Sequence, residues 1–355
     1  MVTWTSLLPK MRIDRKKESG PARRAGAGSL LPLYRTTSSA ALVDDDVDFL
    51  HSMEMSLPMA WNITCHSHPS TLEKLMERSS ALRRKEQQAL FSCVDAQVST
   101  DGHPIAWLLR FLATPTRFEL VGLVVSDFKM PAVDGVTLLS RYGFPGVQRL
   151  LLTGIADNVI AVDAFNGEKI EGFIPKMSAD LPQRVEAMMR RHMAKSAEIR
   201  GQMLARALTQ QVTNVLDDAG AVTAITALLA RLQVDEHVIL GHPAGILALT
   251  LDKRVLWIQL DDQASLTEQA SELAAMTDAL DASMVKAIGA ITAHQATSNH
   301  RLLTEVPSLK LVAAPTEIVC KAPWTTAAVF EIDGLPPDLK PRFHADWLAT
   351  QQGSL

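Results

Sequence analysis

The sequence is poor in cysteine and has no long apolar run, and these absences narrow the classes of protein to which it could belong. Its 355 residues include 3 cysteines, Cys65, Cys93 and Cys320. They lie far apart and are odd in number, so no disulfide framework is expected and the chain fits a reducing, cytoplasmic compartment. Apolar runs such as "LVGLVV" are far too short to span a bilayer. The N-terminus lacks the apolar core of a signal peptide. We therefore expect a cytoplasmic protein without a membrane partner.

Several binding and catalytic signatures are missing as well. The sequence has no glycine-rich phosphate loop, no helix-turn-helix pattern with a basic recognition helix, and no box typical of kinases, phosphatases or cyclic-dinucleotide enzymes. Charge is uneven: residues 1–40 hold eight Lys or Arg and two Asp or Glu, whereas residues 230–355 hold nine and fifteen. The acidic C-terminal half argues against a DNA-binding output. Residues 1–38 are predicted to be a disordered basic arm, which leaves nucleic-acid binding through this arm as an alternative.

The composition and the hydrophobic pattern indicate a soluble α/β protein. Hydrophobic residues make up 47% of the chain and charged residues 21%, which is ordinary for this class. Short apolar runs alternate with segments of helical spacing in the first half of the chain. The expected strands cover residues 40–43, 61–65, 120–127, 149–154 and 170–176, and the expected helices cover 47–57, 69–91, 135–143, 156–167 and 181–195. This alternation predicts a doubly wound, five-stranded parallel sheet over residues 39–195.

The remainder is predicted to hold a helical linker (196–218), a smaller α/β domain (219–335) and a short tail (336–355). An i, i+4 stripe runs through the linker at Leu204, Leu208, Val212 and Leu216. The stripe fits a helix packed on its own domain as well as a dimerising linker. In the smaller domain we expect helices at 218–232 and 264–293, two strands joined by a hairpin at Asp252-Lys253, and later strands at 309–315 and 325–333.

Polar residues stand at the tips of successive strands of the predicted parallel sheet. Asp44 and Asp45 follow the first strand, Asp127 ends the third, Thr153 lies at the tip of the fourth and Lys176 ends the fifth. Ligands of such sheets bind beyond the carboxyl ends of the strands, so these side chains should converge. Clustered carboxylates repel one another, and Mg²⁺ relieves that repulsion. One carboxylate can then attack phosphorus and form an aspartyl phosphate.

These segments together, "VDDD", "SDFKMPAVDG", "LLLTG" and "GFIPK", resemble the receiver domain of bacterial response regulators, the chemotaxis-regulator-like fold. The resemblance covers residues 40–195 and implies the strand order 2-1-3-4-5. It implies that Asp127 is the phosphoacceptor. It also implies that Mg²⁺ is held by Asp44, Asp45, Asp127 and the backbone carbonyl of Lys129.

The same resemblance assigns the switch residues and the partners. Thr153 and Lys176 would be the switch hydroxyl and the lysine that pairs with the phosphoryl group. Phe173 stands at the position of the switch aromatic, and Gly154 is small, as phosphoryl access requires. The implied partner is a sensor histidine kinase or a phosphotransfer protein, and a homodimer is left open.

The predicted function is that of a response regulator in a two-component phosphorelay, which switches an output domain or a partner surface. No enzymatic turnover is expected beyond its own phosphorylation and dephosphorylation. The alternatives are a nucleic-acid-binding regulator acting through the basic arm, where affinity would depend steeply on salt, and a phosphatase-like hydrolase with Asp127 as nucleophile. Against the hydrolase, such chemistry usually needs a general acid two residues after the nucleophile, where this sequence has Lys129.

The sequence departs from the receiver pattern in three places. Asp45 and Asp127 are 82 residues apart, about twice the usual separation, because of an extra segment at about 85–118. We expect this segment at the end of the sheet opposite the strand tips, either as a packed cap or as a partner surface. Met177 replaces the proline that usually follows the lysine. Lys129 places a cation two residues after the phosphoacceptor, where we expect it to alter the lifetime of the phosphoryl group.

Other segments carry weaker signals. Residues 243–273 and 325–333 resemble the C-terminal region of a group of proteobacterial response regulators with the same enlarged receiver and an output of unassigned function. Some of these relatives work in quorum-sensing circuits, and a nucleotide-binding-like output fold is proposed for them. The cluster "CHSH" at 65–68 has metal-ligand residue types, but no second cluster completes a site. Trp257 is expected in the core.

Overall fold

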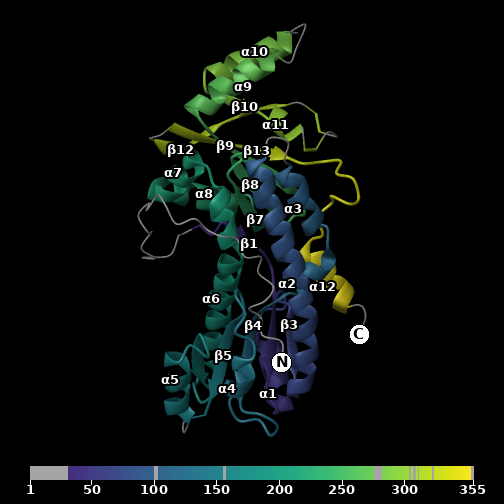
Figure 1. The fold of residues 1–355 in the computed structure, drawn as a ribbon, viewed down its shortest axis with the longest axis vertical. Coiled ribbons are helices and arrows are strands. Elements are labelled where there is room, and N and C mark those ends of the chain that lie inside the picture. The colour runs from purple at the N-terminus through teal and green to yellow at the C-terminus, as the bar shows by residue number, and fades with distance from the viewer. Residues whose placement is uncertain are drawn as a thin grey trace, which may run out of the picture. The chain divides into compact units, whose positions relative to one another are not determined.

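The computed structural model describes residues 31–352 except for 100–102, 155–156, 276–281, 304, 307–308, 311 and 322–323. These residues form a sheet of five strands, a sheet of six strands and a two-stranded ribbon, with helices packed around them (Figure 1). Among the described helices, none alone has both the length and the apolar character needed to cross a membrane. The pair α7 (Gln210–Asp217) and α8 (Ala219–Arg231), bent by 90°, meets those two criteria only when taken together.

The five-stranded sheet is parallel throughout and has the predicted order. Its strands lie in the order β3-β2-β4-β5-β6, so that the first strand of the unit lies between the second and the third. The strands are β2 (Ser39–Val43), β3 (Ile63–His66), β4 (Val121–Asp127), β5 (Gln148–Thr153) and β6 (Gly172–Pro175). The predicted doubly wound fold with the order 2-1-3-4-5 is therefore confirmed.

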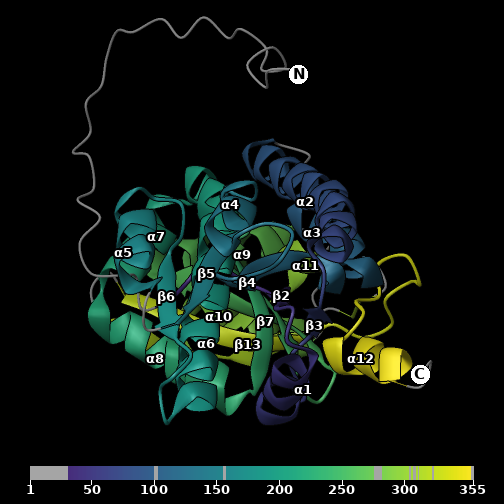
Figure 2. The same cartoon turned by 90° about the horizontal axis from the view of Figure 1, so that it is seen from below.

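Helices cover both faces of this sheet, which explains why its central strands are continuous apolar runs. The helices are α1 (Val47–Ser56), α2 (Pro69–Val98), α4 (Gly135–Ser140), α5 (Asn158–Asn166) and α6 (Leu181–Gly201). Figure 2 shows α2, α4 and α5 on one side and α1 and α6 on the other. Two separate apolar clusters match this division: one holds Leu72 of α2 and Leu138 of α4, the other Leu50 of α1 and Val185 of α6.

The six-stranded sheet is antiparallel and has the order β1-β7-β8-β9-β13-β12. Its strands are β1 (Tyr34–Arg35), β7 (Val234–Leu240), β8 (Gly245–Thr250), β9 (Val255–Asp262), β12 (Glu317–Lys321) and β13 (Trp324–Glu331). The predicted hairpin is the β8–β9 pair, and Lys253 in its turn has a φ of +68°. Trp257 is fully buried, as expected.

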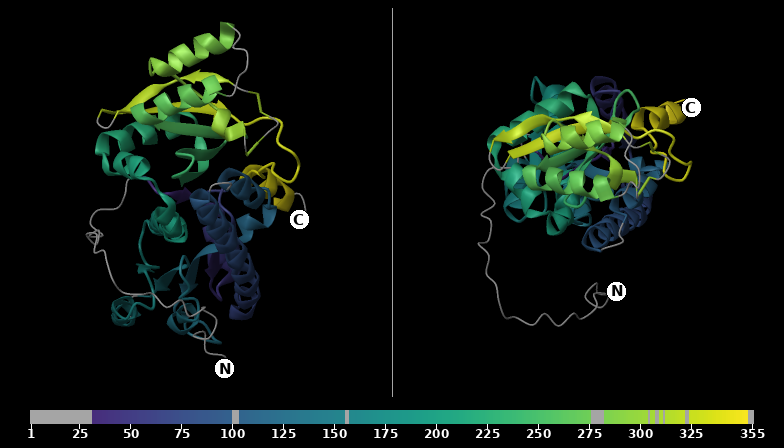
Figure 3. Two further views of the ribbon diagram at one scale, coloured as in Figure 1. Left: turned by 45° about the horizontal axis from the view of Figure 1, so that its top comes forward. Right: turned by 90° about the horizontal axis from the view of Figure 1, so that it is seen from above.

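Shorter elements complete this region. The helices are α7, α8, α9 (Gln263–Ala275), α10 (Ala282–Thr292), α11 (His300–Leu303) and α12 (His344–Gln352), and the ribbon pairs β10 (Ala296–Ser298) with β11 (Ala313–Pro315). Figure 3 shows α9 and α10 in light green beside the green and yellow strands of the sheet. The sequence pattern predicted α8 and the helical stretch at 264–293, whose residues 276–281 lie outside the described part.

The expectation for residues 31–38 is wrong. They were predicted to belong to a disordered arm, but Tyr34 and Arg35 pair with β7 as an edge strand of the antiparallel sheet. Tyr34 is 1% exposed, and its hydroxyl donates a hydrogen bond of 2.8 Å to the carboxylate of Glu86 on α2. The polar composition of the arm gives no sign of this two-residue strand. It is stabilised by β7 and Glu86, which are distant in the sequence. Residues 1–30 of the predicted arm lie outside the described residues.

The predicted helical stripe through the linker is also wrong as a continuous feature. Helix α6 ends at Gly201, a 3-10 helix η4 (Gln202–Ala207) follows, and Leu208 is extended before α7 begins. Leu204 and Val212 are both fully buried but belong to different apolar clusters of the six-stranded sheet. Of the two alternatives, a helix packed on its own domain and a dimerising linker, these two residues fit packing within the chain.

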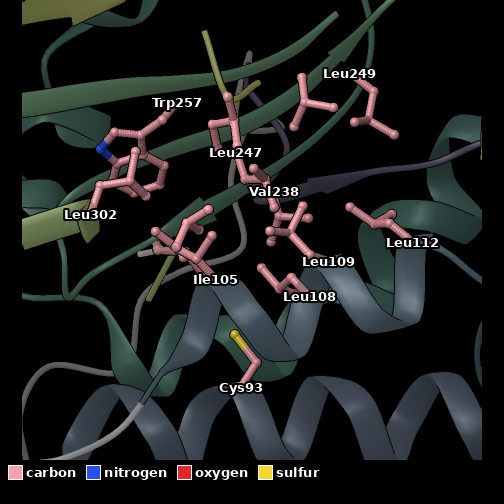
Figure 4. Packing of buried hydrophobic residues seen from close by; sticks show 14 of the residues in the cluster. Cys93, Ile105, Leu108, Leu109, Leu112, Val238, Leu247, Leu249, Trp257 and Leu302 are labelled. Carbon is pink, nitrogen blue, oxygen red and sulfur yellow. The ribbon is translucent and has the colours of Figure 1, made fainter. Parts of the chain in front are cut away.

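The extra segment, about 85–118, packs on the six-stranded sheet. It contains the end of α2, then α3 (Pro104–Leu112) and the 3-10 helix η2 (Pro115–Glu119). Figure 4 shows Leu108 and Leu109 of α3 facing Val238 and Leu247 of the sheet. All four side chains are 2% exposed or less. This apolar face of α3 is therefore a packed cap and not a partner surface.

Glu305 caps α3 from a distant part of the chain. Its carboxylate oxygen Oε2 accepts hydrogen bonds from the backbone N–H of Ile105 at 2.6 Å and of Ala106 at 3.1 Å. Burial is the main influence on this carboxyl and raises its pKa from 4.5 to about 7, although the two backbone hydrogen bonds act to lower it. A buried acid that titrates near neutrality couples the stability of this packing to pH.

We expect Glu305 to make the protein less stable as the pH rises from about 4.5 to about 7. The folded state keeps a proton in this window that the unfolded chain has lost, so the folded state binds more protons and is weakened by rising pH. At about 1.4 kcal/mol per pKa unit the loss is about 3 kcal/mol. Urea unfolding at about pH 5 and about pH 8 should show this component in the wild type and not in Glu305→Gln. Equal pH dependence in the two proteins would contradict the assignment.

Candidate functional site

Most of the residues predicted for the site come together at the carboxyl edge of the parallel sheet. Asp44 directly follows β2, and Asp127 is the last residue of β4. Thr153 ends β5, and Lys176 follows β6, where its backbone N–H donates to the carbonyl of Thr153 at 2.8 Å. Parallel pairing aligns these strand ends, so residues separated by up to 132 positions in the sequence meet at this edge of the sheet, and the place where their side chains meet is called the crevice.

The ammonium group of Lys176 bridges two buried carboxylates. Its Nζ atom lies 2.6 Å from Oδ2 of Asp44 and 2.7 Å from Oδ1 of Asp127. It also lies 4.5 Å from the centre of the Phe49 ring, which adds a cation–π contact. Burial acts to lower the pKa of Lys176, but its hydrogen bonds to Asp127 and Asp44 and their charges outweigh burial and raise the pKa. The bridge therefore keeps this lysine charged.

The site also contains a group of three carboxylates. Asp44, Asp45 and Asp127 each offer an oxygen, and these oxygens lie within 4.8 Å of one another. Asp44 and Asp127 are buried, whereas Asp45 is exposed. Burial, the main influence, raises the pKa of Asp44 even though Lys176 acts to lower it. The two buried acids are thus already compensated by one cation, and a hard divalent cation that prefers oxygen ligands fits the whole set.

Backbone donors hold the two buried carboxylates in place. The N–H of Asp46 donates to Oδ1 of Asp44 at 3.1 Å, and the N–H of Lys129 donates to Oδ2 of Asp127 at 2.9 Å. Gly135 is the first residue of α4, and only glycine fits there, since a Cβ atom would lie 2.1 Å from the carbonyl oxygen of Asp127. Asp134 therefore caps α4, and Gly135 allows the start of α4 to lie close to the end of β4.

The predicted switch residues lie around the same crevice. Thr153 is fully buried, and its hydroxyl donates to Oδ1 of Asn158 at 3.4 Å. Phe173 lies in β6 and is half-buried against the apolar cluster on the α2 side of the sheet. Gly154 follows Thr153, and a Cβ atom at this position would lie 3.0 Å from Oδ2 of Asp157. Met177 is 73% exposed, and Lys176 reaches both acids with methionine at that position.

Sequence reasoning missed two residues of the crevice. Asp157 is 6% exposed overall and forms an ion pair of 3.4 Å with the ammonium of Lys129. Phe49, in the first turn of α1, contacts Lys176 as described. Neither carried a sequence signal, because a polar residue at a helix start and an aromatic residue in an amphipathic helix are both common. The cluster at 65–68 does not form a metal site among the described residues; His66 is hydrogen-bonded to Thr71 and Thr64 instead.

Comparison with known proteins adds one match over nearly the whole chain. The response regulator LqsR of Legionella pneumophila superposes with a TM-score of 0.63 at 19% sequence identity, covering 90% of this chain and 96% of that chain. The fold is like that of LqsR. At this identity the likeness concerns the fold alone, and it extends over both sheets. No protein-family model matches the sequence, and no curated protein matches it.

Other solved structures overlap with a smaller part of this fold. A receiver domain from Clostridium thermocellum (TM-score 0.29, 15% identity) covers 44% of this chain and 95% of its own. The receiver domain of an HD-domain protein from Pseudomonas fluorescens (TM-score 0.30, 19% identity) covers 49% and 95%. These scores are too low to support any inference, and the assignment of the fold depends on the sheet order and the match to LqsR.

Proposed function

We propose that the protein is a two-component response regulator that accepts a phosphoryl group on Asp127 and uses it to switch its output region or a partner surface. One observation supports this most strongly: the ammonium of Lys176 contacts both Asp127 and Asp44 at the strand tips, beside Asp45 and Thr153. A buried acid presented with its own cation and neighbouring acids is poised for phosphoryl chemistry.

In the reaction, a carboxylate oxygen of Asp127 attacks the phosphorus of the donor. The new P–O bond forms as the bond from phosphorus to the leaving group breaks, and the leaving group takes that electron pair. The side chain of Lys176 then pairs with the added negative charge, and the Thr153 hydroxyl turns from Asn158 to donate to a phosphoryl oxygen. We expect Phe173 to turn inward with Thr153 and repack the face formed by residues 155–185.

The acid cluster fits Mg²⁺, because its ligands are carboxylate oxygens and two of them are buried. Asp44, Asp45 and Asp127 would hold the ion together with the backbone carbonyl of Lys129. When bound, Mg²⁺ supplies positive charge that neutralises the phosphoryl oxygens during transfer. The chain's own residues position the nucleophile, since the backbone N–H of Lys129 and the ammonium of Lys176 each contact one oxygen of Asp127.

The partner in this proposal is a sensor histidine kinase or a phosphotransfer protein in the cytoplasm, which supplies the phosphoryl group from phosphohistidine. The chemistry is signalling rather than turnover of an external substrate. Lys129 stands where a phosphatase-like enzyme would need a general acid, and its ammonium is paired with Asp157.

Incubation with acetyl phosphate and Mg²⁺, followed by intact-mass analysis, tests the proposal. The wild type should gain the mass of one phosphoryl group, and Asp127→Asn should gain none, because the amide is not a nucleophile toward phosphorus. Asp163→Asn is a matched control, since Asp163 is an exposed acid of α5 outside the crevice. It should be labelled like the wild type. Equal labelling of Asp127→Asn and wild type would refute the proposal.

A further inference from the structure

The start of helix α5 is held by two residues whose side chains border the phosphoryl crevice. The hydroxyl of Thr153 donates to Asn158, the first residue of the helix, at 3.4 Å. The ammonium of Lys129 pairs with Asp157, the residue before it, at 3.4 Å. Lys129 is anchored at the crevice by its own backbone N–H, which donates to the carboxylate of Asp127. The contacts therefore link the acceptor loop to the α5 start.

The two partners of the ion pair differ strongly in their burial. The side chain of Asp157 is 8% exposed, whereas that of Lys129 is 70% exposed. The carboxylate of Asp157 folds back over Gly154, where even a methyl group would lie 3.0 Å from its Oδ2 atom. It does not cap α5 with its side chain. A buried carboxylate that makes no cap and pairs with an exposed cation is costly to leave unpaired.

We propose that Asp157 is a positioning residue that competes with the phosphoryl group for the ammonium of Lys129. This inference depends on the proposed function. In the resting state Lys129 pairs with Asp157. When Asp127 carries a phosphoryl group, its added charge of about −1.5 to −2 attracts the same ammonium. Lys129 then exchanges partners, Asp157 is left without its cation, and the contact that holds the α5 start is released.

The segment released by this exchange carries an apolar surface. Val159, Ile160, Val162 and Phe165 of α5 are 73%, 45%, 43% and 50% exposed. Thr153 contacts Asn158 next to them, so both crevice residues would leave the α5 start in the same event. The exchange therefore adds an electrostatic coupling from the phosphoryl group to this surface, in parallel with the movement of the hydroxyl.

The lifetime of the phosphoryl group tests the competition. During loss of the group, the oxygen of water bonds to phosphorus and the Asp127–phosphorus bond breaks, which returns the carboxylate and inorganic phosphate. Asp157→Asn removes the competitor, so Lys129 stays with the phosphoryl group and hydrolysis should slow by about threefold to fivefold, the size expected for an ion pair with one exposed partner. The wild type and Asp157→Asn are each labelled with acetyl phosphate and desalted. Loss of the phosphoryl mass in Mg²⁺ is then followed by intact-mass analysis.

A second background separates competition from other roles of Asp157. In Lys129→Met the additional change Asp157→Asn should leave the lifetime unchanged, because there is no ammonium to compete for. If Asp157 instead acted on the attacking water, Asp157→Asn would slow hydrolysis in both backgrounds, and this result would overturn the proposal. Asp157→Glu should restore a lifetime close to that of the wild type, and the exposed control Asp163→Asn should not change it.

The outcomes distinguish this inference from the proposed function. If the wild type is not labelled at all, the proposed function fails and the inference fails with it. If the wild type is labelled and Asp157→Asn has the wild-type lifetime, only the competition is wrong. Thermal unfolding of each variant is measured alongside. If Asp157→Asn is unfolded, the comparison of Lys129→Met with the wild type decides: an unchanged lifetime overturns the proposal, and a shortened one supports it.

Discussion

Replacing Lys176 with methionine is expected to lower the free energy of unfolding by about 3 kcal/mol in the absence of divalent cations. The ammonium contacts Asp44 at 2.6 Å and Asp127 at 2.7 Å, and both carboxylates are buried. Methionine keeps most of the side-chain volume but leaves the two acids facing each other without a cation. Mg²⁺ should reduce the loss, because it can be held by the same carboxylates.

Urea unfolding with EDTA and with Mg²⁺ measures both parts of this prediction. Lys195→Met is the matched control, because Lys195 forms an exposed ion pair with Glu198, and such pairs contribute at most about 1 kcal/mol. The control should show a small loss that Mg²⁺ does not alter. If the free energy of unfolding falls no further in Lys176→Met than in the control, the bridge does not stabilise the folded protein.

Arg117→Met is expected to destabilise the protein by about 3–5 kcal/mol, the range observed when one partner of a buried ion pair is removed. The side chains of Arg117 and Glu236 are 1% and 3% exposed and lie 2.7 Å apart. The guanidinium also donates to the carbonyls of Leu112 and Arg342, so it connects the extra segment, β7 and the C-terminal tail. Removing it leaves Glu236 as a buried charge that keeps one donor, the hydroxyl of Thr36.

A double-mutant cycle measures the pair itself. Arg117→Met with Glu236→Gln should cost less than the two single changes together, because the second change removes the stranded charge. Arg231→Met is the exposed control, since its partner Glu317 and Arg231 are both about 60% exposed, and about 1 kcal/mol is the upper expectation there. Strict additivity of the buried pair would show that Arg117 acts only through its carbonyl contacts.

The group of side chains at the edge of the parallel sheet could be predicted because each strand and helix has a local sequence pattern. Each strand could be identified from a short apolar run, and parallel strands place their final residues at one edge. Asp44, Asp127, Thr153 and Lys176 therefore converge although they are far apart in the sequence. The glycine at 135 and the capping acid before it gave a recognisable turn at the acceptor loop. These features need only the order of strands and helices along the chain, which the hydrophobic pattern supplies.

The parts that could not be predicted depend on long-range contacts. Strand β1 has two residues and is stabilised by pairing with β7, some 200 positions away. Glu305 caps α3 across a similar separation. The break at Leu208 lies where the chain packs closely against the end of β7; a Cβ atom at Gly241 would lie 2.1 Å from the carbonyl of Ala207. Neither helical spacing nor composition carries such information.

Helix α2 shows how the two sheets are joined in one chain. Its 30 residues span about 45 Å at 1.5 Å per residue. Leu72 near its start packs in a cluster of the parallel sheet, and Leu90 near its end packs in a cluster of the six-stranded sheet. Glu86 between them is buried and pairs with Arg200 at the end of α6, at 2.6 Å. One helix therefore contributes side chains to an apolar cluster of each sheet.

The most direct test of the central claim is to locate the phosphoryl group. Protein treated with acetyl phosphate and Mg²⁺ is reduced with borohydride, which converts an aspartyl phosphate to homoserine, and is then digested and sequenced by tandem mass spectrometry. We expect homoserine at position 127 and unchanged aspartate at positions 44 and 45. Homoserine at another acid, or none at position 127 in protein that carries the phosphoryl mass, would contradict it.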